Sequence, residues 1–374
     1  MTYLNNVELS ILMPCLNESE TIANCIEKSK AQIKNLNINA EIVVADNGSN
    51  DGSIEIAKKH GARLVHVKDK GYGNTLKKGI ENCYGTYVFI ADSDQSYDFN
   101  EISSFYNKIL EGYDLVQGCR LSSGGGKIEK GAMPITHKYI GNPFFTMLCK
   151  LLFGLSFDDI YCGMKILRKK KFDKISIIST GMVFCLEILI KFEFNKFKST
   201  QLPITLHKDG RIKNKSHLRT ISDGLKTLKF IIIFSPIQFF FIPSLILTLI
   251  SIYIAKDFFL LDHENSLFGN KHLISFLQSF TSLFLAIQIF MLGLYVSLRA
   301  EELGFKKENN LKKFFNFFSL KKSLIINSLI ITLSIFFSQM FKSELISLIT
   351  TISILISITI IFNSFFISLL KENN

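Results

Sequence analysis

The sequence predicts an α/β domain with a mostly parallel sheet, followed by an all-α membrane domain of four transmembrane helices. Two observations lead to this fold class. Short apolar runs alternate with segments of helical spacing in the first part of the chain, and long uncharged stretches follow one another after Phe230. We therefore expect residues 1–229 to form the sheet domain, with juxtamembrane helices near 216–229, and residues 230–374 to form the membrane domain.

The predicted strands and helices alternate from the start of the chain. The apolar runs predicted as strands are Glu8–Met13, Ala40–Ala45, Ala62–Val67 and Thr86–Ala91, and the helical segments between them are Glu20–Lys34, Ser53–His60 and Gly73–Cys83. Such an alternation implies a parallel sheet covered by helices, in which ligands bind at the carboxyl ends of the strands. Polar clusters lie at three such ends, at Asn17-Glu18, at residues 46–52 and at Asp92-Ser93-Asp94.

Asp92 and Asp94 directly follow the last of these apolar runs. Side chains alternate along an extended chain, so both carboxylates can face one divalent cation, or one can bind it directly and the other through water. Hard cations with oxygen ligands are the ones that bind substrate phosphates. Taken alone, an Asp-x-Asp after a strand is an ordinary polar turn. Three acid-bearing loops at one sheet edge favour a site.

Four stretches without a charged side chain predict the transmembrane helices. They are Phe230–Ala255, Leu273–Leu298, Ser323–Phe341 and Leu345–Leu370. Each reaches the roughly 20 residues that cross a bilayer. The alternative is a set of buried helices in a soluble core, but consecutive apolar helices at the end of a chain have little else to bury against.

Charges in the loops predict the orientation. The connection after the second span carries Arg299, Lys306, Lys307, Lys312, Lys313, Lys321 and Lys322, whereas the connection after the first carries Asp257, Asp262 and Glu264 against Lys256 and Lys271. Positive loops stay in the cytoplasm, so we expect a multi-pass integral membrane protein with its catalytic domain and both termini cytoplasmic. The net charge of +11 suits anionic lipid, and nucleic acid is not a predicted partner. The strand-like start predicts no secretory leader, and the absence of a Cys-x-x-Cys pair predicts reduced thiols.

Several motifs together carry a family resemblance. Residues 10–18 (SILMPCLNE), 44–52 (VADNGSNDG) and 89–94 (FIADSD) resemble successive signatures of family 2 glycosyltransferases with the GT-A fold. Residues 159–165 (DIYCGMK), 179–184 (STGMVF) with Glu187, 207–211 (HKDGR) and 216–224 are most similar to polyprenyl-phosphate glycosyltransferases of the dolichol-phosphate mannose or glucose synthase type. The resemblance covers nearly the whole chain and implies a GT-A nucleotide-sugar-binding domain.

The resemblance also implies roles for individual residues. Pro14, Asn17 and Glu18 would line the nucleotide pocket, and Asp46 would accept a hydrogen bond from the base, with Ser49 and Asp51 close by. Asp92 and Asp94 would position Mg²⁺ or Mn²⁺ on the donor diphosphate, where the metal neutralises charge on the leaving nucleotide. For Glu18 and Asp51, a helix cap or turn is an equal alternative.

The implied acceptor is a polyprenyl phosphate, undecaprenyl or dolichyl, which is already ionised and needs cations more than a base. The residues we expect to hold it are Arg120, Arg211, Lys213, Lys215 and Arg219, and Arg is favoured because its planar guanidinium binds two phosphate oxygens at once. The alternative for Arg211, Lys213 and Lys215 is a basic belt that binds anionic headgroups. Asp159 and Glu187 either order these cations or cap local structure.

At two positions this sequence differs from the family pattern, which limits the roles that the resemblance implies. Ser96 stands where mannose-type enzymes have a Gln after the metal motif, and Val183 stands where the Thr-Gly-Met motif is often followed by Glu. The run Ser96-Tyr-Asp-Phe99 resembles glucose-type members and favours a UDP-sugar such as UDP-glucose over GDP-mannose. The chain has no Trp, which excludes the Gln-x-x-Arg-Trp motif of processive synthases and favours transfer of a single sugar. Gly124–Gly126 predicts either a lid or an exposed linker.

Two functions from different classes remain. The first is inverting, metal-dependent transfer of one sugar from a nucleotide-sugar to polyprenyl phosphate at the cytoplasmic membrane face. The second is a catalytically idle, membrane-bound subunit that binds a sugar nucleotide and recruits or regulates a glycolipid translocation partner. Intact Asp92 and Asp94 favour the first, and the spans lack the ionisable residues expected of a transporter. Assembly into a homo-oligomer is left open.

Overall fold

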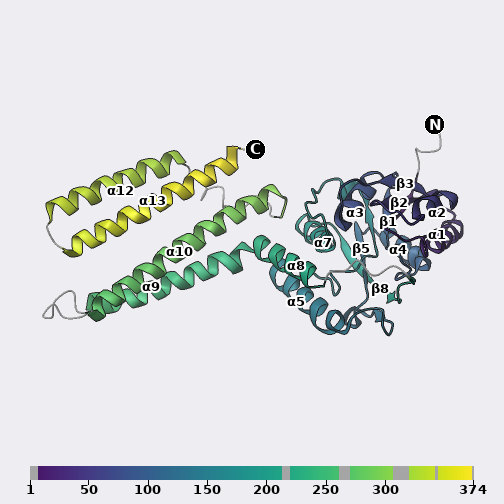
Figure 1. Cartoon of the computed structure of the whole chain (residues 1–374), viewed down its shortest axis with the longest axis horizontal. Helices are drawn as coiled ribbons and strands as arrows, with labels where there is room; N and C mark the ends of the chain where they lie inside the picture. The colour runs from purple at the N-terminus through teal and green to yellow at the C-terminus, as the bar shows by residue number, and fades with distance from the viewer. Residues whose placement is uncertain (1–6, 213–219, 261–269, 306–319, 342–343, 373–374) are drawn as a thin grey trace. The chain divides into compact units, whose positions relative to one another are not determined.

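The computed structural model describes residues 7–212, 220–260, 270–305, 320–341 and 344–372, which divide into two compact units at residues 231 and 232. The first unit is an α/β domain and the second is a set of long helices (Figure 1). The predicted class of a mostly parallel sheet domain followed by apolar helices is confirmed. Each unit is described by itself.

A seven-stranded sheet forms the centre of the first unit, with strand order β3-β2-β1-β4-β7-β5-β8. Its strands are β1 (Leu9–Cys15), β2 (Ala40–Asp46), β3 (Arg63–His66), β4 (Tyr87–Ile90), β5 (Leu115–Cys119), β7 (Lys165–Arg168) and β8 (Ser199–Pro203). The first four strands are parallel, β7 runs antiparallel to both β4 and β5, and β8 is parallel to β5. A separate parallel ladder joins β6 (Lys127–Ile128) to β9 (Thr205–Leu206).

Helices cover the two faces of this sheet. They are α1 (Ile22–Leu36), α2 (Ser53–Lys59), α3 (Tyr72–Glu81), α4 (Ile102–Leu110), α6 (Lys169–Phe172) and α7 (Phe184–Phe194), and the chain also forms α5 (Asn142–Phe153) and α8 (Thr220–Phe234). Alternate residues of β1 separate the faces, because Ile11 packs in the cluster that includes α1 and α4, whereas Leu12 lies against Gly79 of α3. Phe89 and Phe105 are fully buried with ring centroids 5.6 Å apart, and such burial stabilises by about 1.5–3 kcal/mol per side chain.

The strands and helices expected up to residue 91 all form, with shifts of a few residues at their ends. The expected carboxyl-end clusters therefore lie at one edge, because β1, β2 and β4 run parallel and adjacent. The antiparallel strand β7 was not predicted. It separates β4 from β5, so the second half of the sheet does not continue the simple strand and helix alternation of the first half.

The second unit contains α9 (Ile242–Leu260), α10 (Asn270–Glu302), α12 (Leu320–Met340) and α13 (Glu344–Glu372), and within its described residues four helical stretches are long and apolar enough to cross a membrane. Small polar residues join neighbouring helices. The Ser251 hydroxyl of α9 donates to the Ser279 carbonyl of α10 at 2.9 Å, and Ser364 of α13 donates to Ser323 of α12 at 2.8 Å. Small side chains let apolar helices approach closely in this way.

One boundary differs from the expectation for the first span. Residues from Phe230 to Phe234 belong to α8, and the membrane-length stretch begins at Ile237. The reason is Pro236, which lacks a backbone N–H and disfavours the helical conformation at Ser235. The juxtamembrane helix is accordingly longer than expected at its carboxyl end.

Candidate active site

The two acids lie at the carboxyl end of β4, as predicted. One oxygen of Asp92, Oδ1, accepts a hydrogen bond from the Tyr72 hydroxyl at 2.9 Å. Asp94 Oδ1 accepts from the backbone N–H of Ser96 at 3.0 Å and from its hydroxyl at 2.5 Å. Gln95 has a φ of 64°, and this left-handed residue makes the turn that follows the acids tight. Asp92 is thus fixed through Oδ1, and the turn after the acids fixes Oδ1 of Asp94.

Burial and the neighbouring charge of Asp94 raise the pKa of Asp92 from 3.8 to about 6. The amino group of Lys165 opposes this rise, as does the guanidinium of Arg211. Lys165 is fully buried on β7 and donates to the carbonyl of Cys162 at 2.8 Å and to that of Gly163 at 3.4 Å. A buried cation therefore lies beneath the acid pair.

The loops after β1 and β2 are joined by hydrogen bonds. The backbone N–H of Asn17 donates to Ser49 Oγ at 2.9 Å, and the N–H of Asn50 donates back to Asn17 Oδ1 at 2.9 Å. The N–H of Ser19 donates to Asp51 Oδ2 at 3.0 Å. This reciprocal pairing brings Asn17, Ser49 and Asp51 together although the two loops are more than 30 residues apart in the chain.

Asp46, Asp51 and Pro14 make contacts that order the same edge. Asp46 is buried and accepts from the N–H groups of Gly48 and Ser49 at 2.9 and 3.0 Å, and Asp51 accepts from the N–H of Ser53 at 3.1 Å at the start of α2. Both carboxylates therefore make the bonds of the turn alternative, while their part in nucleotide binding stays a prediction. The carbonyl of Pro14 accepts from Ser93 Oγ at 2.7 Å and so ties β1 to the acid loop.

Arg211 reaches this edge from the segment after β9. Its Nε donates to Glu18 Oε2 at 3.0 Å, and one terminal nitrogen lies 3.3 Å from Asp94 Oδ2. The segment is pinned by its backbone as well, because the N–H of Gly210 donates to the Asp94 carbonyl at 2.8 Å and that of His207 to the Ser96 carbonyl at 2.9 Å. Burial raises the pKa of Glu18 although Arg211 opposes the rise. The structure thus brings Glu18, Asp94 and Arg211 into one network.

Arg120 does not join this network among the described residues. Its side chain is 8% exposed and forms a two-point ion pair with the fully buried Asp159, at 2.7 Å from Nε and 2.9 Å from a terminal nitrogen. Asp159 therefore orders this cation, which was one of its two expected roles. Arg120 as a phosphate ligand stays a prediction, and Lys213, Lys215 and Arg219 lie outside the described residues.

Glu187 takes the local structural role. It is fully buried, accepts from the N–H of Ile178 at 3.0 Å and from that of Ser179 at 2.8 Å, and lies 2.8 Å from the Lys191 amino group. The ion pair with Lys191 offsets the free-energy cost of burying the charged Glu187 carboxylate. Glu187 thereby fixes the loop before α7.

Sequence reasoning missed Tyr72, Gly163 and Lys165 as parts of the site. A Cβ at Gly163 would lie 2.8 Å from Asp92 Oδ2 and 3.1 Å from the Tyr97 hydroxyl, so only glycine fits between them. The sequence contains only weak indications of the roles of Tyr72 and Lys165. Lys165 and Arg168 flank only two apolar residues, and Tyr72 stands between two glycines, and neither pattern by itself indicates a partner.

The donor set suits a divalent cation held jointly with a diphosphate. Three carboxylates, Glu18, Asp92 and Asp94, face the two cations Arg211 and Lys165, which leaves an excess of negative charge. Within the described part of the chain nothing donates to Asp92 Oδ2, and carboxylate oxygens are what Mg²⁺ and Mn²⁺ prefer. Among the described residues no group of three or more His, Cys, Asp or Glu side chains has the arrangement to hold a metal ion by itself, so substrate or water would complete the ligand shell.

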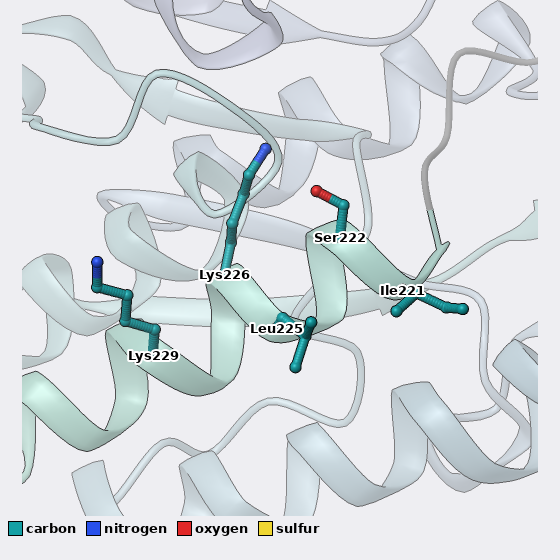
Figure 2. A pocket seen from close by; sticks show the side chains of 5 residues that line it. All are labelled: Ile221, Ser222, Leu225, Lys226 and Lys229. Atoms are coloured by element: carbon teal, nitrogen blue, oxygen red, sulfur yellow. The ribbon is translucent and has the colours of Figure 1, made fainter.

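A separate hollow of about 530 Å³ lies along α8 and is lined by Ile221, Ser222, Leu225, Lys226 and Lys229. Figure 2 shows the side chains of Lys226 and Lys229 rising on one side of the helix ribbon while Leu225 points away from them. Ile221 and Leu225 are 79% and 62% exposed. This pairing of amines with exposed apolar groups is typical of a helix that lies at the surface of an anionic bilayer.

Comparisons with known proteins agree with the motifs at this edge. The family model Glycosyl transferase family 2 matches residues 10–176. Low-salt glycan biosynthesis hexosyltransferase Agl6 of Haloferax volcanii is 32% identical over 246 residues, which are 65% of this chain and 58% of that protein. The dolichyl-phosphate hexose transferase of the same organism is 28% identical over 205 residues, 54% of this chain and 85% of that protein.

This chain therefore spans less than two thirds of the Agl6 relative. Glucosyl-3-phosphoglycerate synthase of Mycobacterium tuberculosis with uridine diphosphate has 18% identity and a TM-score of 0.47, over 62% of this chain and 80% of that one, a likeness too low to support an inference. The family model covers β1, β2 and β4 with the acid loop that follows them. Residues 10–176 of this chain, which include the acid loop, therefore match glycosyl transferase family 2.

Proposed function

We propose that this chain transfers a single hexose from a nucleotide-sugar to a polyprenyl phosphate at the cytoplasmic membrane face, with inversion and with a divalent cation. One observation carries the proposal. The acid pair at the end of β4 is joined by an ion pair to Arg211, whose segment leads into α8 and then into the helices of membrane length. A site for an anionic nucleotide is thereby joined through the chain to helices that are apolar and long enough to cross a lipid bilayer.

Relatives support the choice of substrates. The names of two of them, a hexosyltransferase and a dolichyl-phosphate hexose transferase, agree with a hexose donor and a polyprenyl phosphate acceptor. For the nucleotide we propose UDP-glucose before GDP-mannose, on the strength of the run Ser96-Tyr-Asp-Phe99. The product would be a lipid-linked sugar that serves as donor in a later transfer.

We assign the residues of this chain separate roles in the transfer. Asp92 and Asp94 would hold Mg²⁺ or Mn²⁺, which when bound neutralises charge on the leaving diphosphate. The acceptor phosphate oxygen forms a bond to the anomeric carbon as the bond from that carbon to the diphosphate breaks, so the configuration inverts. The acceptor is already ionised and no proton has to be removed. Arg211 would bind a substrate phosphate in competition with its contacts to Glu18 and Asp94.

The test is transfer of radiolabelled sugar by purified full-length protein from UDP- and GDP-sugars to undecaprenyl or dolichyl phosphate, with Mg²⁺ or Mn²⁺ and with EDTA. We expect EDTA-sensitive label in the lipid fraction and its loss in Asp94→Asn. The matched control is Asp173→Asn, which removes an exposed carboxylate that accepts from Lys169 at 3.2 Å. Normal transfer by Asp94→Asn would exclude the metal role, and nucleotide binding without transfer from any donor would favour the idle subunit.

A further inference from the structure

Tyr72 is the side chain that fixes Asp92, and the proposed function has not used it. Its hydroxyl donates to Asp92 Oδ1 at 2.9 Å, and the opposite oxygen faces Gly163. A phenol carries its proton at neutral pH, so Tyr72 is the donor of this hydrogen bond and the Asp92 oxygen is the acceptor. A carboxylate held by one oxygen in this way presents the other in a defined direction.

The position of Tyr72 is built by close packing of the backbone. It is the first residue of α3 and lies between Gly71 and Gly73. A Cβ at Gly71 would collide with the carbonyl oxygen of Thr180, and one at Gly73 would collide with that of Ser179. Gly71 also has a φ of 128°, which a side chain would strain. The two glycines thus let the start of α3 lie directly against the loop before α7.

Hydrogen bonds fix both the start of α3 and the loop before α7. Asn47 Oδ1 accepts from the N–H of Gly71 at 2.9 Å, and its amide group donates to the Val67 and Asp69 carbonyls at 3.0 and 2.9 Å. On the other side, the buried Glu187 binds the N–H of Ser179 at 2.8 Å. The path from Asn47 through Gly71 to Tyr72 connects the loop after β2 to the acid loop after β4.

We propose that Tyr72 is a positioning residue that orients Asp92 so that its Oδ2 is presented to the divalent cation, and that the loop after β2 sets this orientation through Asn47. This inference rests on the proposed function, because it needs Asp92 to be a metal ligand. Partners that orient a metal ligand typically change metal affinity by about 10–100-fold when removed. Tyr72→Phe removes the donor and keeps the ring.

The experiment measures Mn²⁺ binding rather than transfer. Full-length protein in detergent is titrated with Mn²⁺ in the presence of uridine diphosphate and, separately, guanosine diphosphate, and unbound Mn²⁺ is followed by electron paramagnetic resonance. We expect Tyr72→Phe to weaken Mn²⁺ binding by about tenfold. The matched control is Tyr106→Phe, because Tyr106 also donates to a carboxylate, Glu8 Oε2 at 3.0 Å, away from the acid loop.

A second pair of variants tests whether the close packing at the start of α3 positions Tyr72. Gly73→Ala should displace the start of α3 and weaken Mn²⁺ binding, whereas Gly181→Ala should not, because a Cβ at Gly181 meets no atom within 4 Å. Wild-type affinity in Tyr72→Phe, with Mn²⁺ bound normally by the wild type, would overturn this inference alone. If the wild type binds no Mn²⁺ with either nucleotide, the metal role of Asp92 and Asp94 falls and the inference falls with it.

Discussion

Arg120 and Asp159 carry opposite charges in the interior of the sheet domain. The charge of each residue offsets the free-energy cost of burying the charge of the other. Asp159 is fully buried and accepts from the Arg120 backbone N–H at 3.1 Å as well as from its guanidinium. Removal of one partner of such a pair leaves an unpaired buried charge, whereas removal of both does not. The pair therefore has a measurable signature that a substrate-binding arginine lacks.

We expect Arg120→Met to lower the free energy of unfolding by about 3–5 kcal/mol. The double variant Arg120→Met with Asp159→Leu should recover much of this loss, and thermal unfolding in one detergent provides the comparison. Lys108→Ala is the control, because its ion pair with Glu111 is exposed and contributes little to stability. A stable double variant with an unchanged KM for polyprenyl phosphate would place Arg120 outside the acceptor site.

The raised pKa of Asp92 has a consequence for stability that depends on pH. Its pKa is raised from 3.8 to about 6 in the folded protein, so protonation stabilises the fold below 3.8 and this stabilisation is lost as the pH rises through about 6. Asp92→Asn should therefore raise the Tm of metal-free protein at pH 7.5, with a gain that shrinks as the pH is lowered through 6 and vanishes near 4. A gain that is constant over this range would contradict the assignment.

Residue patterns predicted which acids meet but not what holds them. Asp92 and Asp94 follow a strand, and parallel strands bring their ends together, so their meeting with Glu18 follows from topology alone. The contact of Tyr72 with Asp92 depends instead on how closely α3 approaches the loop before α7. Such an approach is set by packing in three dimensions, and one glycine pair in the sequence does not reveal its partner.

At the scale of elements, α5 and the helical turn before it present an unusually apolar face. Ile135, Tyr139, Ile140, Phe144, Met147 and Leu151 are between 48% and 78% exposed. Their spacing of three and four residues places them on one face of a helix. No Asp or Glu occurs between Glu129 and Asp158, while Lys130, Lys138 and Lys150 do. This combination is typical of a helix that lies in the interface of an anionic bilayer.

The absence of Trp from the chain makes this face easy to test. Leu151→Trp in full-length protein reconstituted with anionic lipid should give a single emission that brominated lipid tails quench, because residue 151 would lie at the acyl boundary. Leu110→Trp is the control, since Leu110 is 54% exposed at the end of α4. Equal quenching at the two positions would argue against an interfacial α5.

Some elements could be predicted from the sequence and others could not. β1 and β4 are almost wholly buried apolar runs bounded by polar turns, which is the pattern of a central parallel strand. β7 has only the residues Lys165–Arg168, begins with a buried lysine and runs antiparallel between two strands. Nothing in a four-residue segment distinguishes its direction, because strand direction is decided by the length and course of the preceding connection.

At the scale of the whole molecule, the orientation in the membrane stays a prediction from loop charge. The chain suits a labelling test because its cysteines are buried and lie at or before Cys185. Ser266→Cys, in the connection after the first span, should react with an impermeant maleimide added to intact cells. Asn309→Cys, in the basic connection, should react only after lysis. The reverse result would place the acid site on the outer face.

The backbone bond from Gly210 to Asp94 fixes the acid pair to the segment that precedes α8 in the chain. Eight residue steps separate Ile212 from Thr220 at the start of α8, and a fully extended chain covers at most about 29 Å over that number of steps. If the acceptor is the membrane-bound polyprenyl phosphate proposed above, it reaches the protein by diffusion in two dimensions. The effective concentration of acceptor is then set by its mole fraction in the membrane, and a water-soluble short-chain phosphate gains nothing from that enrichment.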